Sequence, residues 1–127
     1  MNRIRAGRSV VVRDRRMGTH LWFVLTDPDP STGLVVMVAL VTERSHTEKT
    51  VRLAVGDHPF VRHASTIDFG TARFAPAKRL SERLGHGEAT HDADMSADLL
   101  ARVCQGLLAS SHTINEIASY CRGVFRT

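Results

Sequence analysis

A short polar segment in the middle of the chain holds the densest set of side chains that can do acid–base chemistry. It runs from position 56 to position 65 and contains, in order, Asp57, His58, Arg62, His63 and Ser65. Histidine can donate or accept a proton near neutral pH, and an arginine or a hydroxyl can stabilise a developing oxyanion. The alternative is an exposed turn, in which the carboxylate bonds to the backbone and a proline fixes the corner.

A third histidine, His20, stands at the start of a hydrophobic run and follows Arg15 and Arg16. Its imidazole could transfer a proton beside a groove whose rim binds phosphate through the two arginines. A histidine at a strand start can equally be an ordinary hydrogen-bonded surface residue.

Thr42 and Arg44 follow the longest hydrophobic run, in the string Thr-Glu-Arg-Ser-His. A hydroxyl and a guanidinium at the end of a strand can hold a phosphate, although the same string would also make a plain polar turn. A metal site is not expected, because the spacing of His58 and His63 is no known ligand pattern and no paired carboxylates accompany them.

The charge balance favours a phosphate-rich partner. The 127 residues include 17 lysines and arginines against 13 acids, for a net charge of +4, and 15 of these 17 are arginines. Arginine binds phosphate in a bidentate geometry that lysine does not offer. Six of the arginines fall within the first 16 positions, where Asp14 is the single acid. This stretch is either a solvated arm or an edge that contacts phosphates.

Several classes of protein are disfavoured. The apolar runs are shorter than the roughly 18 residues that span a bilayer, and no secretory signal pattern begins the chain. The sequence therefore predicts a cytoplasmic protein in which Cys104 and Cys121 are reduced thiols. Its length predicts a single domain over residues 1–127.

The elements that must position these residues are strands followed by helices. The run Leu34–Thr42 is too continuously apolar to be half exposed, so it is predicted as a central strand buried on both faces, with Thr50–Val55 beside it. Short strands joined by tight turns predict a small β-barrel over about residues 8–90. The expected strands are Ser9–Val12, Leu21–Leu25, Leu34–Thr42, Thr50–Val55, Ser65–Phe69 and Thr71–Phe74.

The period of the apolar residues becomes helical from Asp94 onward, which predicts a helical part over about residues 94–125. Asp92 and Asp94 are expected to cap the first helix. A second helix is expected after Ser110-Ser111-His112, where Thr113 and Glu116 have the spacing of a capping box. The predicted class is mainly β with two C-terminal helices, an α+β fold.

The order of these pieces resembles the PemK/MazF family, the ribonuclease toxins of bacterial toxin–antitoxin modules, which have a small SH3-like β-barrel with helices. The resemblance lies in segments 20–27, 36–45 and 65–69, and in segment 79–87, which resembles the family's final strand turn, followed by the helix 94–110. The chain departs from the family where the catalytic arginine is replaced by His20 and the next proline by Leu21. The family's threonine matches Thr42, which Glu43 follows.

The resemblance implies an endoribonuclease that needs no metal or cofactor and cleaves single-stranded RNA to 2′,3′-cyclic phosphate and 5′-hydroxyl ends. On this hypothesis His20 and His58 transfer protons, Arg62 or Arg44 binds the phosphate, and Thr42 orients the reacting groups. The residues expected to contact the substrate are Arg15, Arg16, Arg44, His63 and Ser65. The implied protein partners are a cognate antitoxin and a second copy of the chain, as a homodimer.

Two other functions fit the same sequence. A non-catalytic SH3-like module would bind nucleic acid or a protein partner without turnover. A regulatory or phage-associated interaction protein would use its helical C-terminal part to form a stable complex with another protein and would have no affinity for nucleic acid.

Overall fold

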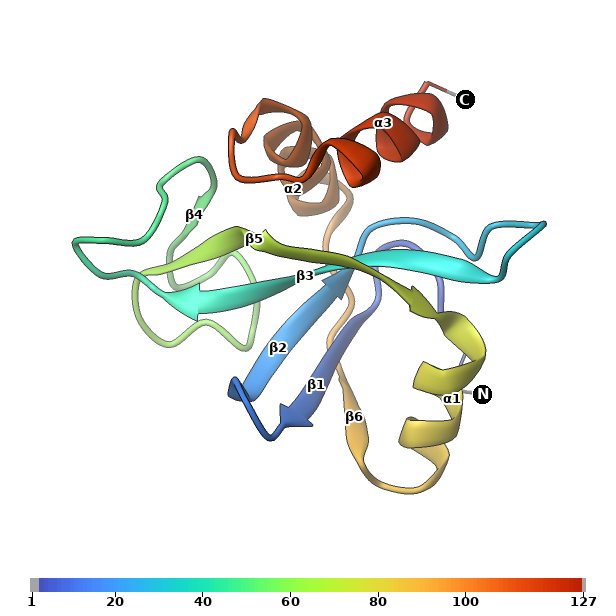
Figure 1. Ribbon diagram of the computed structural model, residues 1–127. Helices are drawn as coiled ribbons and strands as arrows, with labels where there is room; N and C mark the ends of the chain where they lie inside the picture. Colours follow the sequence, from blue (N-terminus) through green and yellow to red (C-terminus); the bar gives the residue numbers. More distant parts are fainter. Residues whose placement is uncertain (1–2, 127) are drawn as a thin grey trace.

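The computed structural model describes residues 3–126 and consists of one curled antiparallel sheet and three helices (Figure 1). The six strands lie in the order β4-β5-β3-β2-β1-β6, which makes a half-barrel. No helix within residues 3–126 has the length and apolar content that crossing a membrane requires. Along the chain the elements are β1 (Ser9–Asp14), β2 (Gly18–Val24), β3 (Leu34–Thr42), β4 (Arg52–Leu53), β5 (Ser65–Pro76), α1 (Ala77–Gly85), β6 (Ala89–Asp92), α2 (Ala97–Ala109) and α3 (Asn115–Val124).

The strand β3 lies inside the sheet between β2 and β5, and its middle is buried on both faces, as its apolar run predicts. The prediction that Thr50–Val55 lies beside it is wrong. Only Arg52 and Leu53 form a strand, and they pair with the first two residues of β5, Ser65 and Thr66. Apolar and polar residues alternate over Thr50–Val55 because Val51 and Leu53 are buried in the core, although the segment forms only a short stretch of strand pairing.

The two strands expected between Ser65 and Phe74 are one long strand, β5. Its pairing with β3 is irregular between Met37 and Ala39, where the Thr71 hydroxyl accepts from the Ala39 amide at 3.0 Å and donates to the Asp68 carbonyl at 2.6 Å. A side chain therefore replaces the missing ladder bond, and the strand continues through the irregularity.

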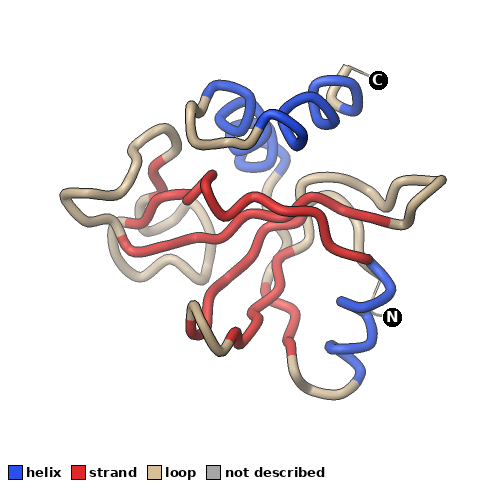
Figure 2. The backbone as a smooth tube through the Cα atoms, in the orientation of Figure 1, coloured by secondary structure: helices blue, strands red, loops and turns tan. Residues whose placement is uncertain are grey.

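The sheet has an apolar core on each face. Leu21 and Phe23 of β2 point to the face that α2 and α3 cover, whereas Trp22 and Val24 point to the opposite face, where Leu80 of α1 packs. Figure 2 shows α2 and α3 together on one side of the sheet and α1 apart from them. The alternation along β2 thus follows the two-residue period of a strand.

The helix α1 and the strand β6 are absent from the predicted elements, and the strand turn expected over segment 79–87 is wrong. Pro76 precedes the first turn of α1, where its missing N–H costs nothing. Leu80 is the only residue of α1 that is fully buried. Most residues around Leu80 in the sequence are charged or polar, so the segment shows no clear helical period of apolar residues.

The caps of the C-terminal helices also differ from expectation. The Ser96 hydroxyl, not Asp92 or Asp94, caps α2 by accepting from the Leu99 amide at 3.1 Å. Asp92 instead ends β6. The Thr113 hydroxyl donates to the Leu107 carbonyl at 2.7 Å and joins the two helices, so it forms no capping box.

Close packing of α2 on the sheet depends on Gly106. A Cβ at this position would overlap the Val51 side chain and come within 2.9 Å of the Phe69 ring. The two cysteines of these helices are unpaired, and burial raises the pKa of Cys104 to about 11 and that of Cys121 to about 12.

Candidate active site

His20 and Thr42 meet at one edge of the sheet because β2 and β3 run antiparallel. Leu21 pairs with Leu40, so the residue before Leu21 lies next to the end of β3. Thr42 pairs in turn with Ser65, the first residue of β5. Three polar residues distant in sequence are thereby brought to the same edge.

A hollow of about 200 Å³ lies at this edge. Its polar lining consists of Thr19 and of five residues that the sequence predicts as functional: His20, Thr42, Arg62, His63 and Ser65. We call these five residues the strand-end site. Arg62 and His63 reach it from the loop between β4 and β5, and both are exposed.

Thr42 and His63 are in direct contact, with 3.0 Å between Oγ1 and Nε2. Either the threonine hydroxyl donates to a neutral imidazole, or the ring N–H donates to the hydroxyl oxygen. Both arrangements leave Nδ1 of His63 free of this bond and able to exchange a proton with a ligand. Ser65 donates to the His63 carbonyl at 2.9 Å and so fixes the backbone beneath the ring.

His20 has an unused ring nitrogen. Its Nδ1 is buried, and no group in residues 3–126 forms a hydrogen bond with it. A buried polar atom without a partner costs free energy. Arg8 Nε, Trp22 Nε1 and both ring nitrogens of His91 also lack a partner within residues 3–126. The ring of His20 lines two hollows at once, which gives a ligand access to it.

The second hollow, of about 510 Å³, shares His20, Val41 and Thr42 with the first. Arg44 lines it and is exposed. Neither Arg44 nor Arg62 forms an ion pair with any carboxylate of the described residues. Each hollow therefore has its own unpaired guanidinium next to the shared histidine and threonine. Within residues 3–126, no carboxylate lines the first hollow, an arrangement that suits an anion, whereas Glu48 and Asp68 also line the second.

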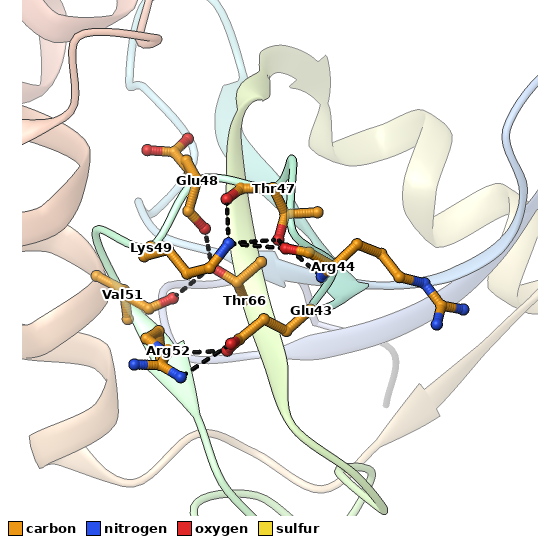
Figure 3. A network of polar contacts seen from close by, with 8 residues as sticks. All are labelled: Glu43, Arg44, Thr47, Glu48, Lys49, Val51, Arg52 and Thr66. Atoms are coloured by element: carbon orange, nitrogen blue, oxygen red, sulfur yellow. Dashed lines mark hydrogen bonds and ion pairs between the residues drawn. The ribbon is translucent and has the colours of Figure 1, made fainter.

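The loop that carries Arg44 is held by a polar network (Figure 3). Arg52 donates two hydrogen bonds to the Glu43 carboxylate, at 2.9 and 2.8 Å, and this pairing lowers the pKa of Glu43. The Lys49 ammonium donates to the carbonyls of Arg44 and Thr47 at 2.7 and 2.6 Å. The backbone of Arg44 is fixed in this way, while its guanidinium points away from the network.

Residues from the helical part also reach the second hollow, and the sequence did not predict them. His112 lines it from the turn between α2 and α3. Glu48 lines it from the loop between β3 and β4. Glu48 accepts from the Phe69 amide at 2.9 Å and from the Ser110 hydroxyl at 2.7 Å, which ties this turn to the loop. No local pattern signals that these segments meet. Within residues 3–126, no group of three or more histidines, cysteines and acids is arranged to hold a metal ion.

His58 lies apart from the strand-end site. It is only 2% exposed, and its Nε2 is 2.7 Å from the Ala93 carbonyl and 3.2 Å from the Ser9 hydroxyl. The Phe60 amide donates to Nδ1 at 3.1 Å, which assigns the proton to Nε2. Both ring nitrogens are occupied, so this histidine anchors the loop to β1 and to the residue after β6.

Arg15 and Arg16 lie in the turn between β1 and β2 and line a third, larger hollow of about 1030 Å³. Neither borders the hollows around His20. Thr19 is the residue that this third hollow shares with the hollow of about 200 Å³ at the strand-end site. The two arginines therefore extend the basic surface beyond the strand-end site.

The fold is that of the MazF/PemK toxins. Three crystal forms of a MazE–MazF complex from Deinococcus radiodurans match the structure over 84% of this chain and 92–94% of theirs, with TM-scores of 0.54–0.56. The sequence identities are 23%, 18% and 19%. No protein-family model matches the sequence. No curated protein matches it either.

Proposed function

We propose that this MazF-like fold is an endoribonuclease that cleaves single-stranded RNA without a metal ion, with the strand-end site as its active site. The observation that carries the proposal is the meeting of His20, Thr42, Arg62 and His63 at one hollow. Two imidazoles, a hydroxyl and a guanidinium are the groups that phosphodiester transfer within RNA needs.

In the proposed reaction the ribose 2′-hydroxyl attacks the adjacent phosphorus while a base removes its proton. The bond from phosphorus to the 5′-oxygen breaks, and an acid protonates that oxygen, which leaves a 2′,3′-cyclic phosphate and a 5′-hydroxyl. His20 and His63 serve as base and acid in an order we leave open. His58 takes no part, because its buried ring has both nitrogens bonded.

Thr42 and the arginines act on the phosphate and on the histidines. The contact of Thr42 with His63 orients the imidazole. Thr42 also lines both hollows, so its hydroxyl can bond a phosphate oxygen bound there. Arg62 and Arg44 approach from the two sides and stabilise the negative charge that grows on the phosphorane.

His20 stands where the PemK/MazF pattern has a catalytic arginine, and the rest of the site is consistent with the exchange. A histidine can transfer a proton, which an arginine does poorly, but it provides a less permanent positive charge. Arg44 and Arg62, both without ion-pair partners in the described residues, provide that charge instead.

We also propose a protein antitoxin as a partner, by analogy with the fold neighbours, which are MazE–MazF complexes. The resemblance to the PemK/MazF family further leads us to propose a homodimer as the active form. Expression in a bacterial host should arrest growth unless the partner is co-expressed. Light scattering of the purified chain should give twice the monomer mass of 14.0 kDa.

The test of the proposed function is cleavage of a mixed single-stranded RNA pool in EDTA. The wild type should cut the pool, and His20→Ala should cut it at least about 100-fold more slowly. Arg122→Gln, an exposed change on α3, is the control and should cut like the wild type. Failure of the wild type to cut the pool, or equal cleavage by His20→Ala, contradicts the proposal.

A second candidate is a non-catalytic module that binds RNA or protein, and the histidine in place of the family's arginine favours it. This module would bind RNA in a salt-dependent way without turnover and would tolerate His20→Ala. Its expression would not arrest growth.

A further inference from the structure

A strongly basic hollow lies outside the strand-end site. The hollow of about 1030 Å³ is lined by six arginines and two carboxylates. We call it the arginine hollow. Its excess of four positive charges equals the formal net charge of the whole chain, +4. The arginines are Arg13, Arg15, Arg16, Arg73, Arg79 and Arg83.

Three separate elements build the arginine hollow, so no stretch of sequence reveals it. Arg13, Arg15 and Arg16 come from the β1–β2 hairpin, Arg73 from β5, and Arg79 and Arg83 from α1. The Arg83 guanidinium donates to the Arg13 carbonyl at 3.1 Å, which holds α1 against β1 across the sequence. The N-terminal charge run thereby becomes one part of a larger surface.

Two of the arginines are held in place before any ligand binds. The Arg73 guanidinium lies 4.3 Å from the centre of the Trp22 ring, a cation–π arrangement. Arg83 lies 3.9 Å from the Glu88 carboxylate in addition to its bond to β1. Fixed guanidinium groups lose little side-chain entropy when they bind phosphate.

The carboxylates in the hollow form no ion pair with the remaining arginines within residues 3–126. Asp14 accepts from the backbone amides of Arg16 and Met17 at 2.7 and 3.2 Å, and these bonds lower its pKa and form the hairpin turn. Within the described chain, Arg13, Arg15, Arg16, Arg73 and Arg79 form no ion pair. The hollow thus has the charge of an unfilled polyanion site.

Its lining also indicates which part of a polyanion it recognises. No aromatic ring lines the arginine hollow, so it has no platform on which a base could stack. Arginines without such platforms bind the sugar–phosphate backbone and position it, whereas base contacts specify the sequence.

We infer that the arginine hollow is a binding track for the phosphates of single-stranded RNA that flank the cleaved bond. Thr19 lines both this hollow and the hollow of about 200 Å³ at the strand-end site, so one strand can continue from the reacting phosphate into the arginines. The choice of RNA as the polyanion rests on the proposed function. Binding itself can be measured without turnover.

The experiment measures fluorescence anisotropy of a labelled, mixed-sequence RNA whose 2′-hydroxyls are all methylated, so that it cannot be cleaved. The variant Arg15→Gln/Arg79→Gln removes two exposed charges from the track, and neither side chain forms an ion pair within residues 3–126. The matched control, Arg122→Gln/Arg126→Gln, removes two exposed charges near the end of α3. Each protein is titrated at several salt concentrations.

The track variant should bind the RNA at least about 10-fold more weakly than the control. Its plot of log affinity against log salt concentration should have a slope that is shallower by about 1.4, since each of the two lost phosphate contacts contributes about 0.7. This result supports the track even if the wild type proves unable to cleave RNA, in which case only the proposed function fails. Equal losses in the track and control variants overturn the inference. A track-dependent affinity for poly-glutamate with none for RNA also overturns it, in favour of an acidic protein partner.

Discussion

The strand-end site and the surroundings of His58 are built from the same residue types and differ in how their hydrogen bonds are used. Each has a histidine near a hydroxyl, Thr42 beside His63 in the first and Ser9 beside His58 in the second. The ring of His58 is buried with both nitrogens bonded, whereas His63 is exposed and His20 has a buried nitrogen without a partner in the described residues.

If the proposed function holds, this difference separates a residue for proton transfer from a residue for stability within one loop. His58 and His63 both lie between β4 and β5, only five positions apart. The first anchors the loop to β1 and the second carries a free ring nitrogen to the edge of the sheet. A histidine becomes available for proton transfer only where the fold leaves one of its nitrogens unpaired.

The largest expected effect is on catalysis, from His20→Ala. General acid–base groups contribute about 100- to 10,000-fold to rates, so the cleavage rate should fall within this range. The melting temperature should change little, because the Nδ1 of His20 makes no hydrogen bond that the variant could lose. Thermal unfolding of the same samples checks this. A parallel loss of stability would make His20 a structural residue like His58.

His58→Ala should produce the opposite result. It leaves the Ala93 carbonyl and the Phe60 amide without their partner and opens a cavity against Phe23, so the free energy of unfolding should fall by about 2–4 kcal/mol. Denaturant unfolding measures the loss. His58→Gln, which keeps an N–H for the carbonyl, should recover part of it, and no recovery would contradict the hydrogen-bond account.

A smaller effect is expected from Thr42→Val, which keeps the shape of the side chain and removes its contact with His63. One hydrogen bond contributes about 0.5–1.5 kcal/mol, so the cleavage rate should fall by up to about 10-fold. Thr42→Ser keeps the hydroxyl and should restore the wild-type rate. An unchanged rate in Thr42→Val would mean that the contact with His63 does not contribute to cleavage.

The smallest effect concerns the loop beside the site. The Arg52 guanidinium holds the pKa of Glu43 below its ordinary value of 4.5, so the pairing stabilises the fold above that pH and is lost as the pH falls through the lowered pKa. Glu43→Gln should therefore lower the melting temperature slightly at neutral pH and not at all in strong acid. A difference between the two proteins that persists in strong acid would show that this carboxylate does not act through its charge.

The sequence predicts the apolar parts of the fold well. The run Leu34–Thr42 coincides with β3, because a strand buried on both faces must be apolar throughout. The helix α1 escapes prediction, because Leu80 is its only fully buried residue. The cap of α2 was assigned to acids, although the nearest hydroxyl, that of Ser96, forms it.

The candidate site also has a part that the sequence predicts and a part that it does not. His20 and Thr42 could be placed together from strand order alone, because antiparallel neighbours bring their ends to one edge. Ser65 could not, because the sequence predicts Thr50–Val55 beside β3, where β5 lies instead. The burial of His58 could not be anticipated, since it depends on a contact with Ala93, which follows the unpredicted strand β6. The arginines of α1 remained outside the predicted basic surface for the same reason.

The most direct test of the account compares His20→Ala and His58→Ala in single-turnover cleavage of RNA in EDTA, well below the melting temperature of both, with mass spectrometry of the product ends. The account predicts 2′,3′-cyclic phosphate and 5′-hydroxyl ends from the wild type, the same ends from His58→Ala at a rate within about 10-fold, and a rate at least about 100-fold lower from His20→Ala. It is contradicted if His58→Ala, while folded, loses cleavage as fully as His20→Ala, or if the wild type makes no such ends.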